Sequence, residues 1–465
     1  METVLLYVLG IVVVLIGIAL SIALHEIGHL VPAKLFGVRV GQYMIGFGPT
    51  IFSRKKGETE YGVKAVPLGG YISMAGMYPP AKKGEPSRTS GTDAFALESE
   101  YETETEKSAG RTASTGFFQA MVQDARTQSE DTIEAGHEDR VFYKLPVWKR
   151  VIIMLGGPAM NVVIAIVLFA IVLSGIGTQG YSTTISTVSA CVIPATSTDQ
   201  TCSGSDPVAP AAAAGIKPGD TLVSINGTAI TTWAQETAII KRSAGKELDI
   251  VVERDGSNLN LTATPIASKR YVLDATGNVV TNAAGKEVTK TVGFLGIGPS
   301  VSLQKQPLTA VLPAVGSTIA ADAKLIANLP AKLYGVVQAL VGTEKRDANG
   351  PMSVVGAGRI AGEITSTTAI PFAERFSSLL GILASLNIAL FAFNLIPLLP
   401  LDGGHVAGAL WEGIRRFFAK LFKRRDPGPV DIAKLVPLTF AVVIILGLMS
   451  ALLIVADIFK PVSIG

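Results

Sequence analysis

The sequence predicts a polytopic α-helical membrane protein with four transmembrane helices and a β-rich soluble domain. Hydrophobic residues make up 48% of the 465 residues and charged residues only 17%, whereas soluble domains carry about 25% charged residues. A helix needs about 20 residues to cross the hydrocarbon of a bilayer, and four uncharged apolar runs reach that length. They are residues 4–24, 151–176, 376–401 and 435–456.

Charge and cysteine content exclude further classes of protein. The formal net charge is +3, a balance too even to indicate nucleic acid as a partner. The chain has only two cysteines, Cys191 and Cys202, which excludes a disulfide scaffold and a Cys-rich zinc module. The sequence allows two alternatives for this pair, a disulfide or two free thiols.

The distribution of lysine and arginine predicts the orientation of the spans. Such residues gather in cytoplasmic loops close to the span ends. Few of them flank the segment 178–375, so we expect this segment and both termini to lie outside the cytoplasm. The basic residues near the other span ends are Lys34, Arg39, Lys144, Lys149, Arg150, Arg415, Arg416, Lys420, Lys423, Arg424 and Arg425.

The N-terminal part divides by composition into a span and two loop segments. Residues 1–35 form the first span, which we expect to be uncleaved because no basic segment precedes it. Residues 38–76 are rich in glycine and β-forming residues and predict short strands. Residues 78–145 turn polar and acidic, which favours a solvated linker over an acidic interaction segment.

One compact β domain is predicted over residues 181–300, after a second span over residues 146–177. Its stretch AAAAGIKPGDTLVSINGTAI, residues 211–230, resembles PDZ domains, in which a helical turn leads through a Gly-Asp turn to a strand. PDZ domains usually bind an extended peptide as an added strand. The same fold also serves as a spacer, so the sequence allows either peptide binding or a spacer role for this domain.

The C-terminal part contains the remaining two spans. Residues 305–372 are apolar but interrupted by charges, which predicts amphipathic helices on the outer surface rather than a fifth span. The third span covers residues 375–403, a basic cytoplasmic loop covers residues 404–433, and the fourth span covers residues 434–458. The third span therefore ends at the cytoplasmic face.

The sequence HEIGH at the end of the first span predicts a metal site. His25 and His29 are spaced i, i+4, which puts both imidazoles on one helix face where they can hold one metal, with Glu26 beside them as general base. Ionisable groups at the edge of the hydrocarbon are costly and normally functional. A polar helix end without metal is the weaker interpretation.

Asp402 is the best candidate for a third metal ligand. A catalytic zinc uses three protein ligands and keeps the fourth position for water. The third span ends in FNLIPLLPLDGGH, which brings Asp402 to the depth of the two histidines. Pro397 and Pro400 should break the helix before it. His405 lies one turn further along and is a competing ligand.

Three motifs together resemble the site-2 proteases. They are HEIGH in the first span, GPAMN at residues 157–161 in the second, and the pattern N-x-x-P-x-x-x-x-D-G in the third. The PDZ-like domain between spans two and three narrows the resemblance to the bacterial RseP-like branch. This chain has room for one PDZ domain, whereas some relatives have two.

The resemblance implies a role for individual residues. His25, His29 and Asp402 would bind Zn²⁺, Glu26 would be the catalytic base, and Asn394 would contact the substrate backbone. Asn387, seven residues earlier on the same helix face, is predicted to be structural. The strands of residues 38–76 match a membrane-reentrant β element thought to clamp substrate. Its predicted substrate-binding residues are Gly69 and Gly70.

The predicted function is zinc-dependent hydrolysis of a peptide bond inside a transmembrane segment. By resemblance, the partner is a single-span membrane protein such as an anti-sigma factor, or a remnant signal peptide, in the bacterial inner membrane. The lipid bilayer is the second expected partner, and nucleic acid is not expected. The alternatives are a degenerate PDZ scaffold and a metal transporter. Neither needs a glutamate beside the first histidine, so Glu26 favours the enzyme.

Overall fold

The computed structural model describes residues 2–80, 117–195, 197, 201–272, 279–282, 286–342, 346–347, 350–368 and 370–462. The chain forms two compact units. Unit 1 comprises Met1–Ser174 and Pro307–Gly465, and unit 2 comprises Gly175–Gln306. Residues 81–116 of the segment 78–145, which we predicted to be a solvated linker, lie outside the described residues.

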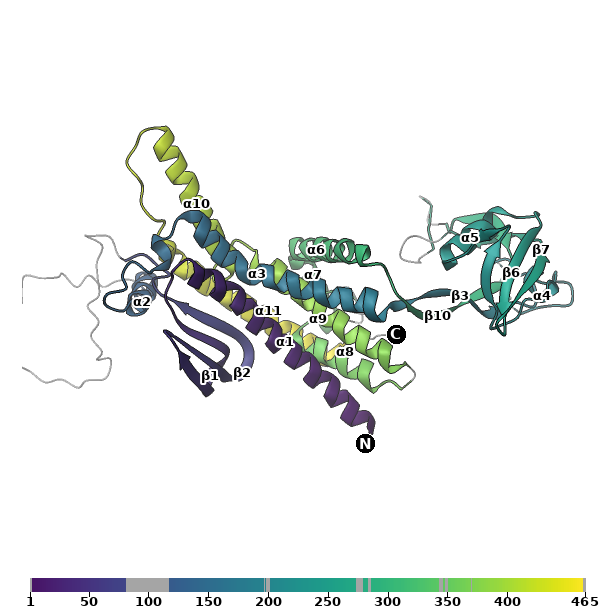
Figure 1. The fold of residues 1–465 in the computed structure, drawn as a ribbon, viewed down its shortest axis with the longest axis horizontal. Coiled ribbons are helices and arrows are strands. Elements are labelled where there is room, and N and C mark those ends of the chain that lie inside the picture. Colours follow the sequence, from purple (N-terminus) through teal and green to yellow (C-terminus); the bar gives the residue numbers. More distant parts are fainter. Residues whose placement is uncertain are drawn as a thin grey trace, which may run out of the picture. The chain divides into compact units, whose positions relative to one another are not determined.

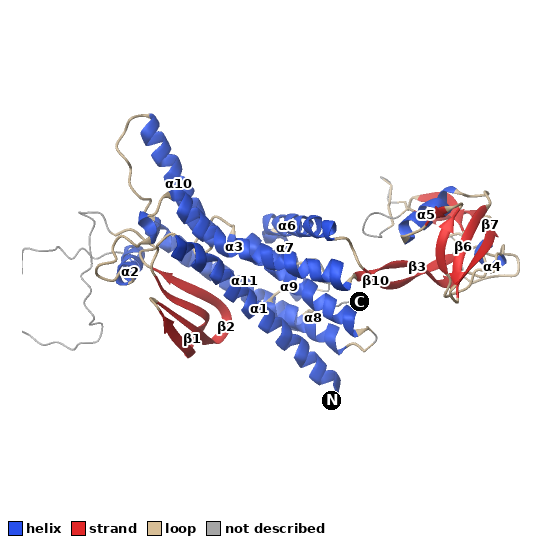
Figure 2. Cartoon of the chain, viewed as in Figure 1, coloured by secondary structure: helices blue, strands red, loops and turns tan. Residues whose placement is uncertain are grey.

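Unit 1 is a helical body with a β element at its side (Figures 1 and 2). Four of its helices overlap the predicted apolar runs: α1 (Glu2–Leu35), α3 (Val147–Ala170), α9 (Phe372–Asn394) and α11 (Val436–Phe459). Helix α9 ends seven residues before the predicted run 376–401 does. Helix α3 continues into a π-helical segment, Ile171–Ile176. The shorter helical elements are α2 (Phe117–Asp131), α7 (Leu329–Val341), α8 (Val354–Ser366), α10 (Asp402–Leu421) and 3₁₀ turns at Phe142–Lys144 and Ile432–Leu435.

Five helical segments of the described residues are long and apolar enough to cross a membrane, one more than we predicted. The additional segment, Leu308–Ala327, joins a 3₁₀ turn (Leu308–Ala310) to α6 (Val311–Ala327). Helix α6 packs against α3 and α9 around Ala165, Val315 and Ile388. The fold is thus that of a polytopic membrane protein, and the surface position of residues 305–372 stays a prediction.

The β element consists of β1 (Val40–Lys56) and β2 (Thr59–Met74). The hairpin curls, so that the first part of β1 pairs with both parts of β2. Residue Ile45 of β1 pairs with Val63 on one side and with Gly70 on the other, and Met44 likewise pairs with Gly62 and Tyr71. The first part of β1 is therefore an inner strand. The last part of β2, residues 70–74, is an edge strand that has no further strand partner among the described residues.

Unit 2 is built on an antiparallel sheet in the order β10-β3-β4-β6-β7, with β5 paired to β4, and on a separate β8-β9 pair. The predicted strands DTLVSING, ELDIVVE and NLNLTATP form β4, β6 and β7. Asp255 and Gly256, with φ of 50° and 76°, make the predicted hairpin turn. The bounds are β3 (Thr178–Val188), α4 (Pro210–Ala213), β4 (Thr221–Ile225), β5 (Thr228–Ala229), α5 (Trp233–Arg242), β6 (Leu248–Arg254), β7 (Ser257–Ala263), β8 (Ile266–Tyr271), β9 (Thr289–Phe294) and β10 (Ile297–Gln304).

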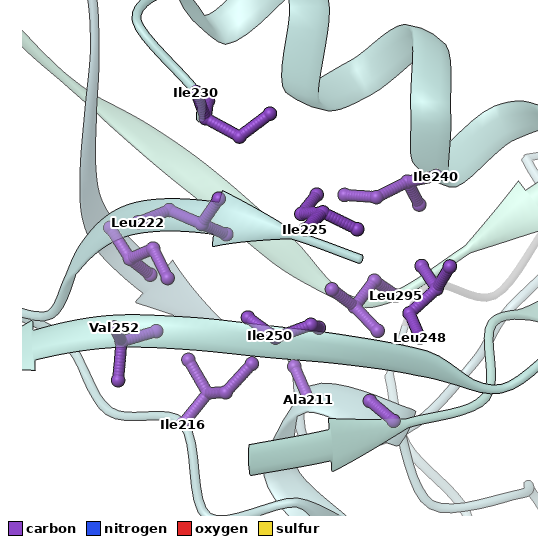
Figure 3. Close-up of a cluster of buried hydrophobic side chains, with 12 residues drawn as sticks. Ala211, Ile216, Leu222, Ile225, Ile230, Ile240, Leu248, Ile250, Val252 and Leu295 are labelled. Atoms are coloured by element: carbon purple, nitrogen blue, oxygen red, sulfur yellow. The ribbon is translucent and has the colours of Figure 1, made fainter. Parts of the chain in front are cut away.

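The core of unit 2 is aliphatic (Figure 3). Leu248, Ile250 and Val252 of β6 alternate inward, as expected for a sheet with one buried face. They share a cluster with Leu222 and Ile225 of β4 and Ile240 of α5. Cys191 and Cys202 form a disulfide in this unit, with Cα atoms 5.9 Å apart. The structure thus selects the disulfide from the two alternatives, and the PDZ-like character of the unit stays a prediction.

Candidate metal centre

Three side chains converge near the end of α1. The Nε2 atoms of His25 and His29 lie 3.2 Å apart. Oδ2 of Asp402, the first residue of α10, lies 3.3 Å from Nε2 of His25 and 3.4 Å from Nε2 of His29. Among the described residues, these three form the one group of at least three His, Cys, Asp or Glu side chains whose geometry fits a metal ion.

The spacing of these atoms fits a zinc ion. Zinc bonds of 2.0–2.1 Å in a tetrahedron place neighbouring ligand atoms about 3.4 Å apart, close to the three observed separations. Oδ2 of Asp402 is buried and forms no hydrogen bond in the described part of the chain. A buried carboxylate oxygen needs a partner, and a cation held between the two histidines supplies one.

Close packing of α1 on α3 makes room for the histidines. A Cβ added to Gly28 would lie 2.2 Å from the carbonyl oxygen of Gly156, and one added to Gly156 would lie 2.0 Å from that of Gly28. Small residues allow two helix backbones to touch in this way. One residue further along, a Cβ on Gly157 would lie 2.2 Å from Nε2 of His29. Gly157 therefore leaves the space that the imidazoles occupy.

Helix α3 also provides hydrogen-bond partners for both imidazole rings. Nδ1 of His29 lies 2.7 Å from the carbonyl oxygen of Ile153. Nδ1 of His25 lies 3.1 Å from the side-chain amide of Asn161, which is fully buried. Contacts of this kind hold a ligating imidazole in one orientation, with Nε2 directed at the metal.

Asp402 reaches the histidines through the turn that joins α9 to α10. Helix α9 ends at Asn394, and residues 395–401 fold against the start of α10. A Cβ on Gly403 would lie 2.4 Å from the carbonyl oxygen of Ile396, and one on Gly404 would lie 2.6 Å from the amide nitrogen of Leu399. The two glycines of the LDGG sequence thus permit the tight turn that presents Asp402.

His405 does not join this group of ligand atoms. Its ring instead stacks on Tyr78, with ring centroids 6.4 Å apart, and its Nδ1 atom is buried without a hydrogen-bond partner among the described residues. The geometry therefore favours Asp402 over His405 as the third ligand.

The side chain of Glu26 on α1 faces the edge strand of the β element. Glu26 follows His25 directly in α1, and its side chain makes no hydrogen bond among the described residues. A Cβ on Gly70 would lie 3.1 Å from Cγ of Glu26, so the strand backbone passes directly beside the glutamate. The neighbouring Gly69 has a φ of 107° and faces the ring of Phe47.

The two asparagines of α9 lie in different surroundings. Asn387 is buried, and its amide donates hydrogen bonds to Oγ of Ser21 on α1 at 2.9 Å and to the carbonyl of Leu383 at 2.8 Å. Asn394 is half-buried at the end of α9, and its side chain has no hydrogen-bond partner in the described part. Asn387 therefore ties α9 to α1, whereas the role of Asn394 stays a prediction.

Sequence reasoning missed the contribution of α3. The motif GPAMN supports the resemblance to site-2 proteases, but the resemblance gave no role to its residues. Gly157 and Asn161 are four residues apart and therefore lie on one helix face, which was the available signal. The carbonyl of Ile153 carries no such signal, because any residue supplies that group.

Comparisons with known proteins agree with this geometry. Residues 13–425 match the model of Peptidase family M50. The chain is 32% identical over 471 residues to Zinc metalloprotease Rip1 of Mycobacterium tuberculosis, covering 99% of each chain. It is 28% identical to Regulator of sigma-W protease RasP of Bacillus subtilis, covering 84% of this chain and 87% of that one. The predicted resemblance to site-2 proteases is thereby confirmed, and the chain belongs to peptidase family M50.

Proposed function

We propose that this protein is a zinc metalloendopeptidase that cleaves a peptide bond inside the membrane-spanning segment of a single-span protein. The observation that carries the proposal is the convergence of Nε2 of His25, Nε2 of His29 and Oδ2 of Asp402 to within 3.2–3.4 Å of one another. Two of these ligands belong to α1, a helix apolar enough to cross a membrane. The relatives named as zinc metalloproteases support the choice of metal.

His25, His29 and Asp402 would hold the ion, and Glu26 would move the proton. Zinc, when bound there, lowers the pKa of a water molecule toward about 7 and polarises the scissile carbonyl. Glu26 has a side chain free to accept the proton of that water and to pass it to the leaving amine. Asn394, at the end of α9, would donate a hydrogen bond to the substrate backbone or to its developing oxyanion.

The edge strand at residues 70–74 would hold the substrate in an extended form. A transmembrane helix buries its carbonyls in hydrogen bonds, so the scissile region must unwind before water reaches it. An open strand edge binds extended peptide by main-chain hydrogen bonds, and this edge passes beside Glu26 at Gly70. Gly69 and Gly70 carry no side chains that would obstruct an incoming backbone.

The membrane arrangement follows the distribution of basic residues. We propose an inner-membrane protein of a bacterium with both termini outside the cytoplasm, four spans at α1, α3, α9 and α11, and an active site near the cytoplasmic face. Residues 181–300 would be an extracytoplasmic PDZ-like domain that selects substrates. Anti-sigma factors and remnant signal peptides are the proposed substrates. The relative named as a regulator of sigma-W protease supports the first class.

Coexpression with tagged single-span substrates tests the proposal. The parent protein should produce a fragment cut within the membrane segment, and Glu26→Gln should abolish cleavage while retaining about one zinc per chain. His25→Ala should lose both zinc and cleavage. Undiminished cleavage by Glu26→Gln would contradict the assignment of the base. Zinc transport without any peptide cleavage by the parent would favour the transporter.

A further inference from the structure

Helix α10 exposes a continuous apolar face along its distal half. Its large apolar side chains are between 46% and 65% exposed. Positions 410, 414, 417 and 421 follow the spacing of one helix face, and positions 411, 418 and 422 widen it. Figure 1 shows this half of α10 projecting beyond the other helices of unit 1. The exposed residues are Leu410, Trp411, Ile414, Phe417, Phe418, Leu421 and Phe422.

Basic residues are interleaved with this apolar face. Residues 415–425, RRFFAKLFKRR, contain six basic and no acidic residues. Arg416 pairs with Glu412 at 3.1 Å and lies 3.5 Å from Asp426. The remaining five form no ion pair among the described residues. They are Arg415, Lys420, Lys423, Arg424 and Arg425.

The position of α10 in the chain keeps this surface close to the membrane. The helix lies between two candidate spans, Phe372–Asn394 and Ile432–Phe459, so its segment leaves and re-enters the membrane at the same face. Arg425 is seven residues before Ile432, which limits their separation to about 25 Å even in a fully extended chain. The backbone amide of Val430 also donates a hydrogen bond to Oε2 of Glu412 at 2.9 Å, which folds the loop back along α10.

We propose that residues 415–425 bind the anionic headgroups of the adjacent bilayer surface, with the aromatic face of α10 inserted at the acyl boundary. A helix with large apolar residues on one face and lysine and arginine around it is typical of membrane-surface binding. Clusters of four to eight basic residues next to a span recognise anionic lipids. Each basic residue near the surface strengthens binding about fivefold.

The combination of side chains favours lipid over other acidic partners. A nucleic-acid surface needs the positive charge but not the exposed aliphatic side chains of Leu410, Ile414 and Leu421. Stacking on bases would employ aromatic rings alone. On this helix the aliphatic and aromatic side chains share one face, which matches the interior of a bilayer.

The proposed lipid surface is separate from the metal centre. Glu412 on α10 is buried and pairs with Arg150 of α3, which holds the first part of α10 against the helix that carries Gly157. Substitutions beyond residue 416 therefore change the surface and leave Asp402 in place.

A fluorescent probe on α10 tests the proposal in the full-length protein. Leu421→Cys is labelled with an environment-sensitive dye and placed in nanodiscs of phosphatidylcholine alone or mixed with phosphatidylglycerol. We expect a blue shift of the emission that is larger in the anionic nanodiscs, that shrinks in high salt, and that is accompanied by quenching from acyl-brominated lipid.

Two sets of substitutions separate the electrostatic and apolar contributions. Lys420→Gln, Lys423→Gln, Arg424→Gln and Arg425→Gln together should abolish the difference between the two lipids. The matched control removes the same number of charges from exposed lysines of unit 2 and should keep that difference. Phe417→Ser with Phe418→Ser should reduce the blue shift in both lipids. The control substitutions are Lys217→Gln, Lys241→Gln, Lys246→Gln and Lys290→Gln.

Three results would overturn the proposal. The first is a solvent-like emission in every lipid, and the second is an emission that does not respond to lipid charge. The third is a response to RNA: adding an RNA oligonucleotide to the protein in phosphatidylcholine nanodiscs produces a blue shift as large as the one in anionic nanodiscs. This result would assign the basic cluster to nucleic acid instead.

Discussion

The side-chain amide of Asn161 on α3 lies 3.1 Å from Nδ1 of His25 on α1. A neutral imidazole that binds metal through Nε2 carries its proton on Nδ1, so its neighbour must be an acceptor. Oδ1 of Asn161 is buried, and when Nδ2 faces the ring it has no hydrogen-bond partner among the described residues. Turning the amide by half a rotation brings Oδ1 to Nδ1, as the carbonyl of Ile153 already does for His29.

Replacing Asn161 with leucine should weaken zinc binding by about 10–100-fold, because His25 loses the acceptor that orients it. Asn161→Asp keeps an acceptor oxygen and should bind zinc at least as tightly as the parent. Competition with a chelator measures both affinities. Asn387→Leu is the matched control, because it also removes a buried asparagine. The side chain of Asn387 contacts Ser21 rather than a histidine. Equal losses in Asn161→Leu and Asn161→Asp would refute the acceptor role.

Adding a single methyl group at Gly157 should empty the metal centre. The Cβ of Gly157→Ala would lie 2.2 Å from Nε2 of His29 and 2.7 Å from Nε2 of His25, so both rings must move. We expect loss of bound zinc and of cleavage in a protein that still inserts into the membrane. The control is Gly381→Ala on α9, where a Cβ meets nothing within 4 Å in the described part of the chain. The measurement is the zinc content per chain. A parental zinc content in Gly157→Ala would contradict the close contact between Gly157 and the two imidazoles.

The two asparagines of α9 should differ in what their loss affects. Asn394→Ala should lower the cleavage rate about a hundredfold, as does loss of one oxyanion donor, with zinc content and melting temperature unchanged. Asn387→Ala should instead lower stability by about 0.6–2 kcal/mol, because it loses the hydrogen bond to Ser21. Cleavage, zinc and melting are measured for both variants. Parental cleavage by Asn394→Ala, or loss of zinc in step with activity, would exclude a contact with substrate.

Unit 2 should become less stable as the pH rises. Glu236 on α5 is fully buried, and neither carboxylate oxygen has a hydrogen-bond partner among the described residues. Burial raises the pKa of Glu236 from 4.5 to about 8. Between these values the folded state keeps a proton that the unfolded state releases, so the free energy of unfolding falls as pH rises through this range and levels off above it.

Hydrogen exchange of the α5 amides in the full-length protein measures this dependence. After correction for the intrinsic exchange rate, protection of the parent should decrease between pH of about 4.5 and about 8. Glu236→Gln cannot ionise and should show a flat profile. An unchanged slope in that variant would mean that another group is responsible.

The spans and the histidine pair could be predicted from the sequence because both depend on local geometry. A helix needs a certain number of apolar residues to cross a membrane, and that number can be counted. The i, i+4 spacing of His25 and His29 determines their common face in any helix. The strands of unit 2 and the turn at Asp255-Gly256 were likewise recognisable from alternation and turn residues.

Contacts between distant segments could be predicted only in part. Asp402 was placed at the histidines by its depth at the end of a span, and the structure brings its Oδ2 within 3.4 Å of both Nε2 atoms. An edge strand within residues 38–76 was expected to hold substrate, but which strand lies beside Glu26 was not predictable, because the register of β1 against both halves of β2 depends on how a long hairpin curls. Length and apolarity likewise did not distinguish a surface position from a span for Leu308–Ala327.

By itself, the sequence determined which helices are apolar enough for a membrane and which side chains on α1 can share a metal. The tertiary structure decided how those side chains are oriented. Gly28 and Gly156 let the α1 and α3 backbones touch, and only at that distance do Asn161 and the carbonyl of Ile153 reach the two imidazoles. The physical reason is that hydrogen bonds act over about 3 Å, so their partners depend on the crossing point of two helices, which neither helix specifies alone.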